Sequence, residues 1–131
     1  MVHQWRDLTS WIISAQLFNS TASTSKIIYG GVSGEVRLCD LRQNGSVQVC
    51  QSGQEITTMA THANAHLFAL GSVHQINVHH ASGSVVNTIK YYDGFIGQKI
   101  APVSCLTFHP NKVLLASGTT DNYISVYALK R

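Results

Sequence analysis

Short apolar runs alternate with polar turns along the whole chain. Three of these runs end in glycine, at residues 27–31, 67–71 and 114–118, and each is followed by a tight turn and an alternating apolar pair such as Val36-x-Leu38. A further apolar run precedes each of the three. A period of two residues is typical of β-strands, and turns rich in Gly, Asn, Asp and Ser favour hairpins. The pattern predicts three antiparallel sheets.

The repeat length points to a propeller. The first spacing between the repeat glycines Gly31, Gly71 and Gly118 lies inside the roughly 40–45-residue period of WD40 blades, and the second is slightly longer. We therefore predict an all-β fold of WD40-type β-propeller blades, with blades at about 7–50, 54–90 and 102–129. The third repeat has no fourth strand, because the chain ends at Arg131. About three blades of a larger propeller, forming an open fragment, are expected.

An aromatic insertion explains the longer second spacing. Residues 91–98 carry Tyr91, Tyr92, Phe95 and Ile96 with two glycines, and their Asp-Gly and Gly-Gln steps interrupt any strand. We expect a loop between the second and third blades. It is the candidate protein-interaction loop, and the alternative is that it packs against its own blades.

Two polar residues are predicted to organise turns. Asp121 lies in the tight turn of the third repeat, where WD40 blades use an acidic residue in a hydrogen-bond network, and His109 precedes Pro110 at a strand end. The Trp-Asp dipeptide that names the repeat is degraded in all three copies. It reads Cys39-Asp40, His79-His80 and Tyr127-Ala128.

Charge and cysteine content change the picture little. Only 11% of residues are charged, and the formal net charge of +3 comes from scattered positions, so a mildly basic solvated surface is favoured over a nucleic-acid interface. No secretory signal is seen, and no run approaches the ~20 apolar residues of a membrane span. Three widely spaced cysteines without a CxxC motif indicate an intracellular chain with reduced thiols.

The sequence carries no recognisable catalytic, cofactor or metal motif. His79 and His80 are adjacent, so in a regular strand they point to opposite faces and cannot chelate one ion. An enzyme site built from His62, His109 and Asp121 is the remaining catalytic alternative. The repeat register would spread these three over turns of separate blades, which argues against it.

The order of the motifs resembles one family in particular. The relevant stretches are Trp5-Arg-x-x-Thr-x-Trp11, residues 34–38, residues 69–73, Lys90-Tyr-Tyr-Asp-Gly-Phe-Ile-Gly-Gln98, residues 104–110 and Tyr123-Ile-Ser-Val-Tyr127. Together they closely resemble the carboxy-terminal end of the Raptor family, the regulatory-associated proteins of TOR. The aromatic run is the most specific of them.

The resemblance implies a non-enzymatic scaffold. Raptor-family proteins link TOR kinase to its substrates in nutrient and growth signalling, as part of TOR complex 1, and end in a seven-bladed propeller. The implied partners are TOR kinase and other components of that complex. The implied place is the cytoplasm, with recruitment to the lysosomal or vacuolar surface. The alternative is a generic intracellular WD40 adaptor unrelated to TOR.

An open arc of three blades would leave two apolar faces uncovered. Ile124 and Val126 would then lie on an unprotected edge, which is a usual template for pairing between chains. The Met1 start suggests a fragment of a longer protein. We therefore expect the isolated chain to be marginally stable and to self-associate.

Overall fold

Three antiparallel sheets make up the part of the chain that a computed structural model describes, namely residues 10–17, 26–40, 46–62, 65–73, 75–90, 102–120 and 122–128. The first sheet consists of β1 (Ile12–Leu17), β2 (Lys26–Gly31), β3 (Glu35–Asp40) and β4 (Ser46–Gln51). The second consists of β5 (Ile56–His62), β6 (Leu67–Ser72), β7 (Gln75–His80) and β8 (Val85–Lys90). The third consists of β9 (Val103–Phe108), β10 (Leu114–Thr119) and β11 (Ile124–Ala128).

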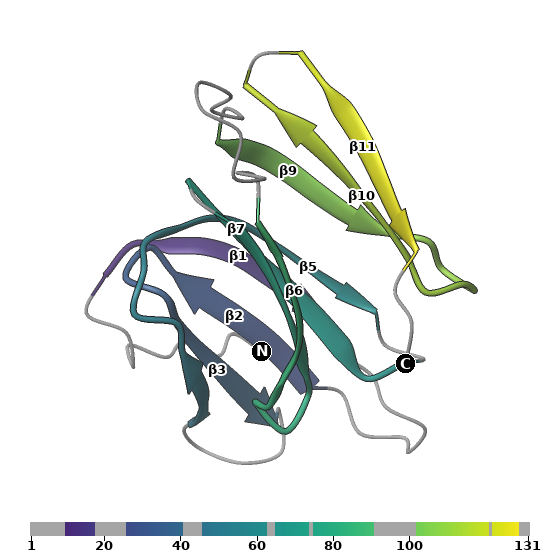
Figure 1. Cartoon of the computed structure of the whole chain (residues 1–131). Coiled ribbons are helices and arrows are strands. Elements are labelled where there is room, and N and C mark those ends of the chain that lie inside the picture. Colours follow the sequence, from purple (N-terminus) through teal and green to yellow (C-terminus); the bar gives the residue numbers. More distant parts are fainter. Residues whose placement is uncertain are drawn as a thin grey trace.

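The strands of each sheet are hydrogen bonded in chain order, so β1, β5 and β9 are each an edge strand. Of these first strands, β5 contacts both β1 and β9 where the sheets meet, and β11 forms the free outer edge of the third sheet (Figure 1). This is how propeller blades are arranged around a common axis. The prediction of an all-β, propeller-type fold is confirmed, and no helix occurs among the described residues.

The three sheets share one irregularity at the same place. The pairing of the first strand with the second shifts by one residue, which leaves Ile13, Thr57 and Ser104 as the extra residues of a β-bulge. Because the bulge recurs, positions can be matched from sheet to sheet by their pairing. The repeats are therefore equivalent in structure as well as in sequence.

This matching corrects the repeat glycine of the first sheet. Gly30, and not Gly31, occupies the position of Gly71 and Gly118, and Gly31 occupies the position of Ser72. The sequence has two consecutive glycines there, so the spacing alone could not fix the register.

A glycine is needed at this position because the next sheet comes very close. A Cβ atom on Gly30 would lie 3.2 Å from Ile56 Cδ1, and one on Gly71 would lie 3.2 Å from Val103 Cγ1. Both of these neighbours belong to the first strand of the following sheet. The glycines thus provide the holes into which the following sheet inserts its side chains.

Two hydrophobic clusters hold the three sheets together. Between the first and second sheets lie Ile28, Val36, Ile56, Met59, Phe68 and Leu70. Between the second and third sheets lie Ala65, Leu67, Ala69, Ile76, Val78, Val103 and Leu115. Each large side chain in these clusters contributes roughly 1.5–3 kcal/mol relative to exposure. The second sheet is consequently covered on both faces.

The third sheet has three strands in the described part of the chain, one fewer than the other two. The predicted loop at residues 91–98, with Tyr91, Tyr92, Phe95 and Ile96, lies outside the described residues. Within the described ranges, no helix is long and apolar enough to cross a membrane.

Candidate protein-interaction surface

The position of the missing Trp-Asp dipeptide is filled differently in each sheet. Cys39 is fully buried in the first sheet and His79 is almost fully buried in the second. Tyr127 of the third sheet is half-buried and packs against the cluster between the second and third sheets. A sulfur, an imidazole and a phenol therefore replace the usual indole, which explains why the motif is hard to recognise in the sequence.

His79 is held in a defined tautomer. Its Nδ1 lies 3.2 Å from the Gly83 carbonyl oxygen, which can only accept, so Nδ1 carries the proton and donates it. The ring stacks on Phe68 with centroids 5.1 Å apart and planes 5° apart. Nε2 is buried without a hydrogen-bond partner. Burial lowers the pKa of His79, and the hydrogen bond to Gly83 opposes this shift.

Two further histidines bind the same turn of the third sheet. Nδ1 of His109 accepts hydrogen bonds from the backbone N–H groups of Asn111 and Lys112, both at 3.0 Å. Nδ1 of His62 accepts from Ala65 N–H at 3.2 Å, so its Nε2–H donates to the Lys112 carbonyl at 3.1 Å. His62 belongs to the second sheet and His109 to the third, as expected, but both contact Lys112 in one turn.

These contacts leave little room for catalysis by this pair. Both nitrogens of His62 and Nδ1 of His109 are occupied by backbone groups, as in structural histidines. Asp121, the third residue of the catalytic alternative, lies outside the described residues. No group of three potential metal ligands is found in the portion of the chain that the structure describes. All three cysteines are thiols.

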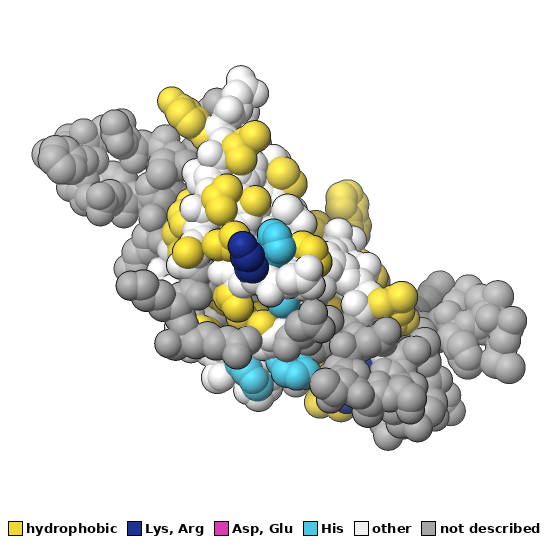
Figure 2. Space-filling model, turned by 90° about the vertical axis from the view of Figure 1, so that its right-hand side faces the viewer, with side chains coloured by type: hydrophobic (Ala, Val, Ile, Leu, Met, Phe, Trp, Pro, Cys, Tyr) yellow, Lys and Arg dark blue, Asp and Glu magenta, His cyan; other side chains and the backbone are white. Residues whose placement is uncertain are grey.

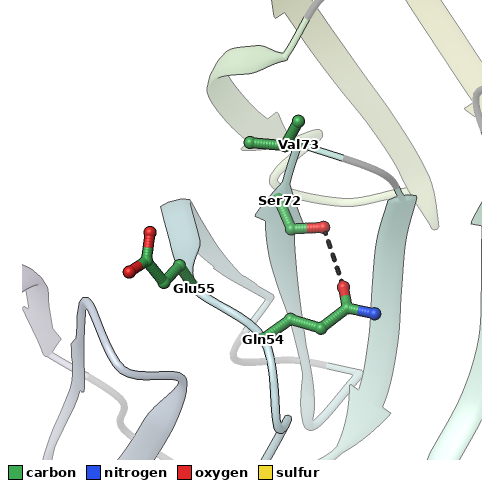
Figure 3. A pocket seen from close by; sticks show the side chains of 4 residues that line it. All are labelled: Gln54, Glu55, Ser72 and Val73. Atoms are coloured by element: carbon green, nitrogen blue, oxygen red, sulfur yellow. Dashed lines mark hydrogen bonds between the residues drawn. The ribbon is translucent and has the colours of Figure 1, made fainter.

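A small hollow lies at one end of the second sheet. It has a volume of about 300 Å3 and is lined by Gln54, Glu55, Ser72 and Val73. Figure 3 shows the Gln54 amide and the Ser72 hydroxyl directed toward each other, 3.3 Å apart, with the Glu55 carboxylate turned away from them. The single Ser72 Oγ proton is donated to the Gln75 carbonyl, the shorter of the two contacts at 2.9 Å. The hydroxyl is therefore used to close the turn between β6 and β7.

The prominent surface feature is exposed apolar side chains at the two ends of the arc. On the third sheet these are Ile124 and Val126 of β11, as the edge argument anticipated. On the first sheet they are Ile12 and Leu17 of β1, which the sequence reasoning did not single out. The repeat could have indicated Ile12, because its position in β1 matches the buried residues Ile56 of β5 and Val103 of β9.

Figure 2 looks at the side on which β11 lies in Figure 1. Hydrophobic side chains gather in the upper half of this face, at the height of the third sheet, among polar and backbone atoms and with little charge. Such a face can bind another protein by shape and apolar burial, without charge recognition. We therefore take the end faces of the arc as the candidate interaction surface.

Comparisons with known proteins point to one group of relatives, although no protein-family model matches the sequence. The chain is 34% identical over 119 residues to the protein raptor homolog of Dictyostelium discoideum, covering 90% of this chain. It is 35% identical over 113 residues to the regulatory-associated protein of TOR 1 of Arabidopsis thaliana, covering 84% of this chain. It spans only 8% of the length of each of these relatives.

The solved structures agree with the sequence matches. The crystal structure of Chaetomium thermophilum Raptor is similar with a TM-score of 0.79 and 25% identity, over 100% of this chain and 12% of that one. The WD40 repeats of RRP9 are similar with a TM-score of 0.73 over 95% of this chain and 37% of that one. At 14% identity, the second match shows the fold alone. The sheets are thus open blades of the WD40 propeller type.

Proposed function

We propose that this chain, which is related over most of its length to a segment of the Raptor proteins, acts as a non-enzymatic scaffold element of a TOR complex. The observation that carries the proposal is the combination of 34% identity over 90% of the chain with a TM-score of 0.79 to a Raptor structure. The RRP9 blades share the fold at less than half of that identity.

The chemistry of the described residues supports a scaffold rather than an enzyme. Both ring nitrogens of His62 and Nδ1 of His109 are hydrogen bonded to backbone groups, and His79 is buried against Phe68. Blades of this type bind partners through loops and faces on a rigid sheet. An apolar, nearly uncharged face suits a stable contact with another folded subunit.

We further propose the partners and the place of action. The partners are TOR kinase and other subunits of TOR complex 1, through which the whole protein links the kinase to its substrates. The complex works in the cytoplasm and is recruited to the lysosomal or vacuolar surface. The sheets serve as consecutive blades at about 7–50, 54–90 and 102–129 of a larger ring, with the aromatic stretch at 91–98 as a candidate contact.

A segment exchange tests the proposal. The matched 119-residue segment of the Dictyostelium relative is replaced by this chain, and TOR kinase that co-purifies with the hybrid is measured. The matched control carries an equal length of RRP9 WD40 repeats, which supply the fold without the relationship. We expect the hybrid to retain TOR kinase to within about twofold, and the control to lose at least about tenfold, equivalent to 1.4 kcal/mol.

The opposite outcome is equally clear. If the hybrid is expressed and folded like the unmodified relative but retains no more TOR kinase than the RRP9 control, the TOR assignment is wrong. The generic WD40 adaptor then becomes the better description. Affinity purification of the 131-residue chain, followed by identification of a complex without TOR kinase, would support that alternative directly.

A further inference from the structure

The uncovered face of the third sheet has apolar residues at the same positions as the faces of the first and second sheets that are covered within the chain. Val36 of β3, Ile76 of β7 and Ile124 of β11 occupy matching positions, each opposite the repeat glycine of its sheet. The first two side chains are 0% exposed, because the following sheet lies on them, whereas Ile124 is 82% exposed. The third sheet therefore presents an interface that lacks its second half.

The glycine hole of this face is also empty. The hole over Gly71 receives Val103 Cγ1 and Leu106 Cδ1 from the following sheet, at 3.2 and 3.3 Å from the position of a Cβ atom. A Cβ atom on Gly118 would instead lie near Cys105 Sγ, which belongs to the same sheet. A hollow of about 230 Å3 remains there, lined mainly by apolar atoms of the third sheet, including Ile124.

The opposite end of the arc carries the side chain that fits such a hole. Ile12 of β1 occupies the position of Ile56 in β5 and of Val103 in β9, one residue before the bulge. Ile56 is 2% exposed and Val103 is 1% exposed, because each is inserted into the preceding sheet. Ile12 is 55% exposed, and Leu17 on the same strand is also exposed.

We infer that these two end faces bind each other between copies of this chain, head to tail, with Ile12 of one copy inserted over Gly118 of the next. The chain itself makes this contact twice, between its first and second and between its second and third sheets. A contact between two different faces can repeat until it closes. Two copies supply six sheets, which lies within the range of about four to eight blades that close a propeller.

One polar group completes the match. Thr57, the bulge residue of the second sheet, places its hydroxyl 3.2 Å from the Gly71 carbonyl and 2.6 Å from the Val103 carbonyl of the following sheet. Ser104 is the bulge residue of the third sheet. Its hydroxyl lies 3.2 Å from the Gly118 carbonyl. In the docked pair, Ile12 of the second copy takes the place of Val103. Its carbonyl then lies near the Ser104 hydroxyl, as the Val103 carbonyl lies near the Thr57 hydroxyl within the chain.

This inference goes beyond the proposed function and does not depend on it, so the purified 131-residue chain is sufficient to test it. Sedimentation over a concentration series gives the mass of the associated species relative to the 14.3 kDa chain. We expect at least two copies, and we expect Ile124→Asp to raise the dissociation constant at least about tenfold, since a charge cannot be buried in this face.

Val47→Asp is the matched control for Ile124→Asp. Val47 is also a well-exposed apolar strand residue, but it lies on β4 and outside both end faces. Its substitution should change the dissociation constant by less than about threefold, because it removes no docking contact. Circular dichroism and thermal unfolding show whether each variant stays folded. A single-copy chain at all concentrations, or equal weakening by both substitutions, would overturn the inference.

A disulfide test locates the contact directly. Thr58, the counterpart of Cys105, and Val103, the counterpart of Ile12, both approach the same point over Gly71. In the docked pair, a cysteine at position 12 should therefore reach Cys105 of the neighbouring copy. After mild oxidation, we expect Ile12→Cys to give a covalent dimer, or a longer series, whose digest contains the peptide linked between positions 12 and 105.

Two controls make this result specific. Cys105→Ser in the Ile12→Cys background should abolish the linked species, and Val47→Cys should give no link to Cys105. Because Cys105 is exposed, it is accessible to oxidation in either case. Absence of the 12–105 link, or its equal formation from position 47, would show that the end faces do not meet in this way.

Discussion

Gly71→Ala is the most direct test of how the sheets are joined. Gly71 is buried on β6, where it faces the third sheet. The added Cβ atom would lie 2.8 Å from Thr58 Cγ2, 3.2 Å from Val103 Cγ1 and 3.3 Å from Leu106 Cδ1. Thr58 belongs to the same sheet, whereas the other two belong to β9. The substitution therefore pushes the second and third sheets apart at Gly71.

The expected loss is moderate and has two opposing parts. Overpacking of a well-filled interface costs about 1–3 kcal/mol. Replacing glycine by alanine reduces the entropy of the unfolded chain, which returns about 0.4–1 kcal/mol. Thr58 is β-branched, so it cannot rotate away freely. We therefore expect Gly71→Ala to lower the free energy of unfolding by about 1–2 kcal/mol.

Gly118→Ala is the matched substitution in the third sheet. It occupies the same register position, but the atom its Cβ would meet is Cys105 Sγ, at 2.7 Å. Cys105 is exposed, so its thiol can rotate toward solvent. In dilute solution, where the copies are dissociated, the lower entropy of the unfolded alanine variant should offset the cost of rotating the Cys105 thiol. We expect the free energy of unfolding to stay within about 0.5 kcal/mol of the parent chain.

Urea unfolding measures both variants against the parent. With a slope of about 1–3 kcal/mol per molar, a loss of 1.5 kcal/mol lowers the midpoint by roughly 0.5–1.5 M. The slope itself should not change, since the same surface is exposed on unfolding. If the two variants lose equal stability, the difference between a covered and an uncovered glycine position is refuted, and with it the close contact at Gly71.

Three further predictions concern the buried histidines and thiols. Burial lowers the pKa of His79 from 6.5, so on acidification the unfolded chain binds this proton before the folded chain does. The stability that neutral His79 contributes is complete above pH 6.5 and is lost as the pH falls toward the lowered pKa. His79→Phe should reduce this loss, as measured by urea titrations at about pH 7.5 and 5.5. His62→Ala should cost about 2 kcal/mol in the same assay, because it leaves the N–H of buried Ala65 unpaired, whereas His80→Ala at an exposed site should cost little. Burial raises the pKa of Cys50 to about 11, so thiol labelling at pH 8 in dilute solution should modify exposed Cys105 first and Cys50 slowly.

Most of the fold could be predicted from the sequence, because each blade encodes its strands locally. Alternating apolar positions and hairpin turns predict a strand before each of the three glycine-ended runs, and the structure has β1, β5 and β9 in these places. Among the described residues the third sheet has three strands, and Ile124 and Val126 on its edge strand are exposed, as the sequence predicts. Period-two patterning works well here because inward and outward positions differ strongly in burial.

The features that could not be predicted from the sequence depend on contacts between sheets. The choice between Gly30 and Gly31 is decided by Ile56 of the next sheet, which is distant in sequence and could not be read from the spacing. The meeting of His62 with the turn at His109 has the same cause, since it joins the second sheet to the third. Pairing within a sheet is a local property of the sequence, whereas packing between sheets is not.

The three residues in the place of the Trp-Asp dipeptide show what this type of blade requires. Cys39, His79 and Tyr127 differ in size, polarity and hydrogen bonding, yet their sheets keep the same bulge and the same register. The constant features are a small residue in the second strand and a large apolar residue in the following sheet's first strand. Contacts of that kind can form within one chain or between chains, because they depend on two faces and not on a connecting loop. The open ends of the arc carry the same matching positions as its interior, so a partner that binds there must supply the other half of a sheet contact.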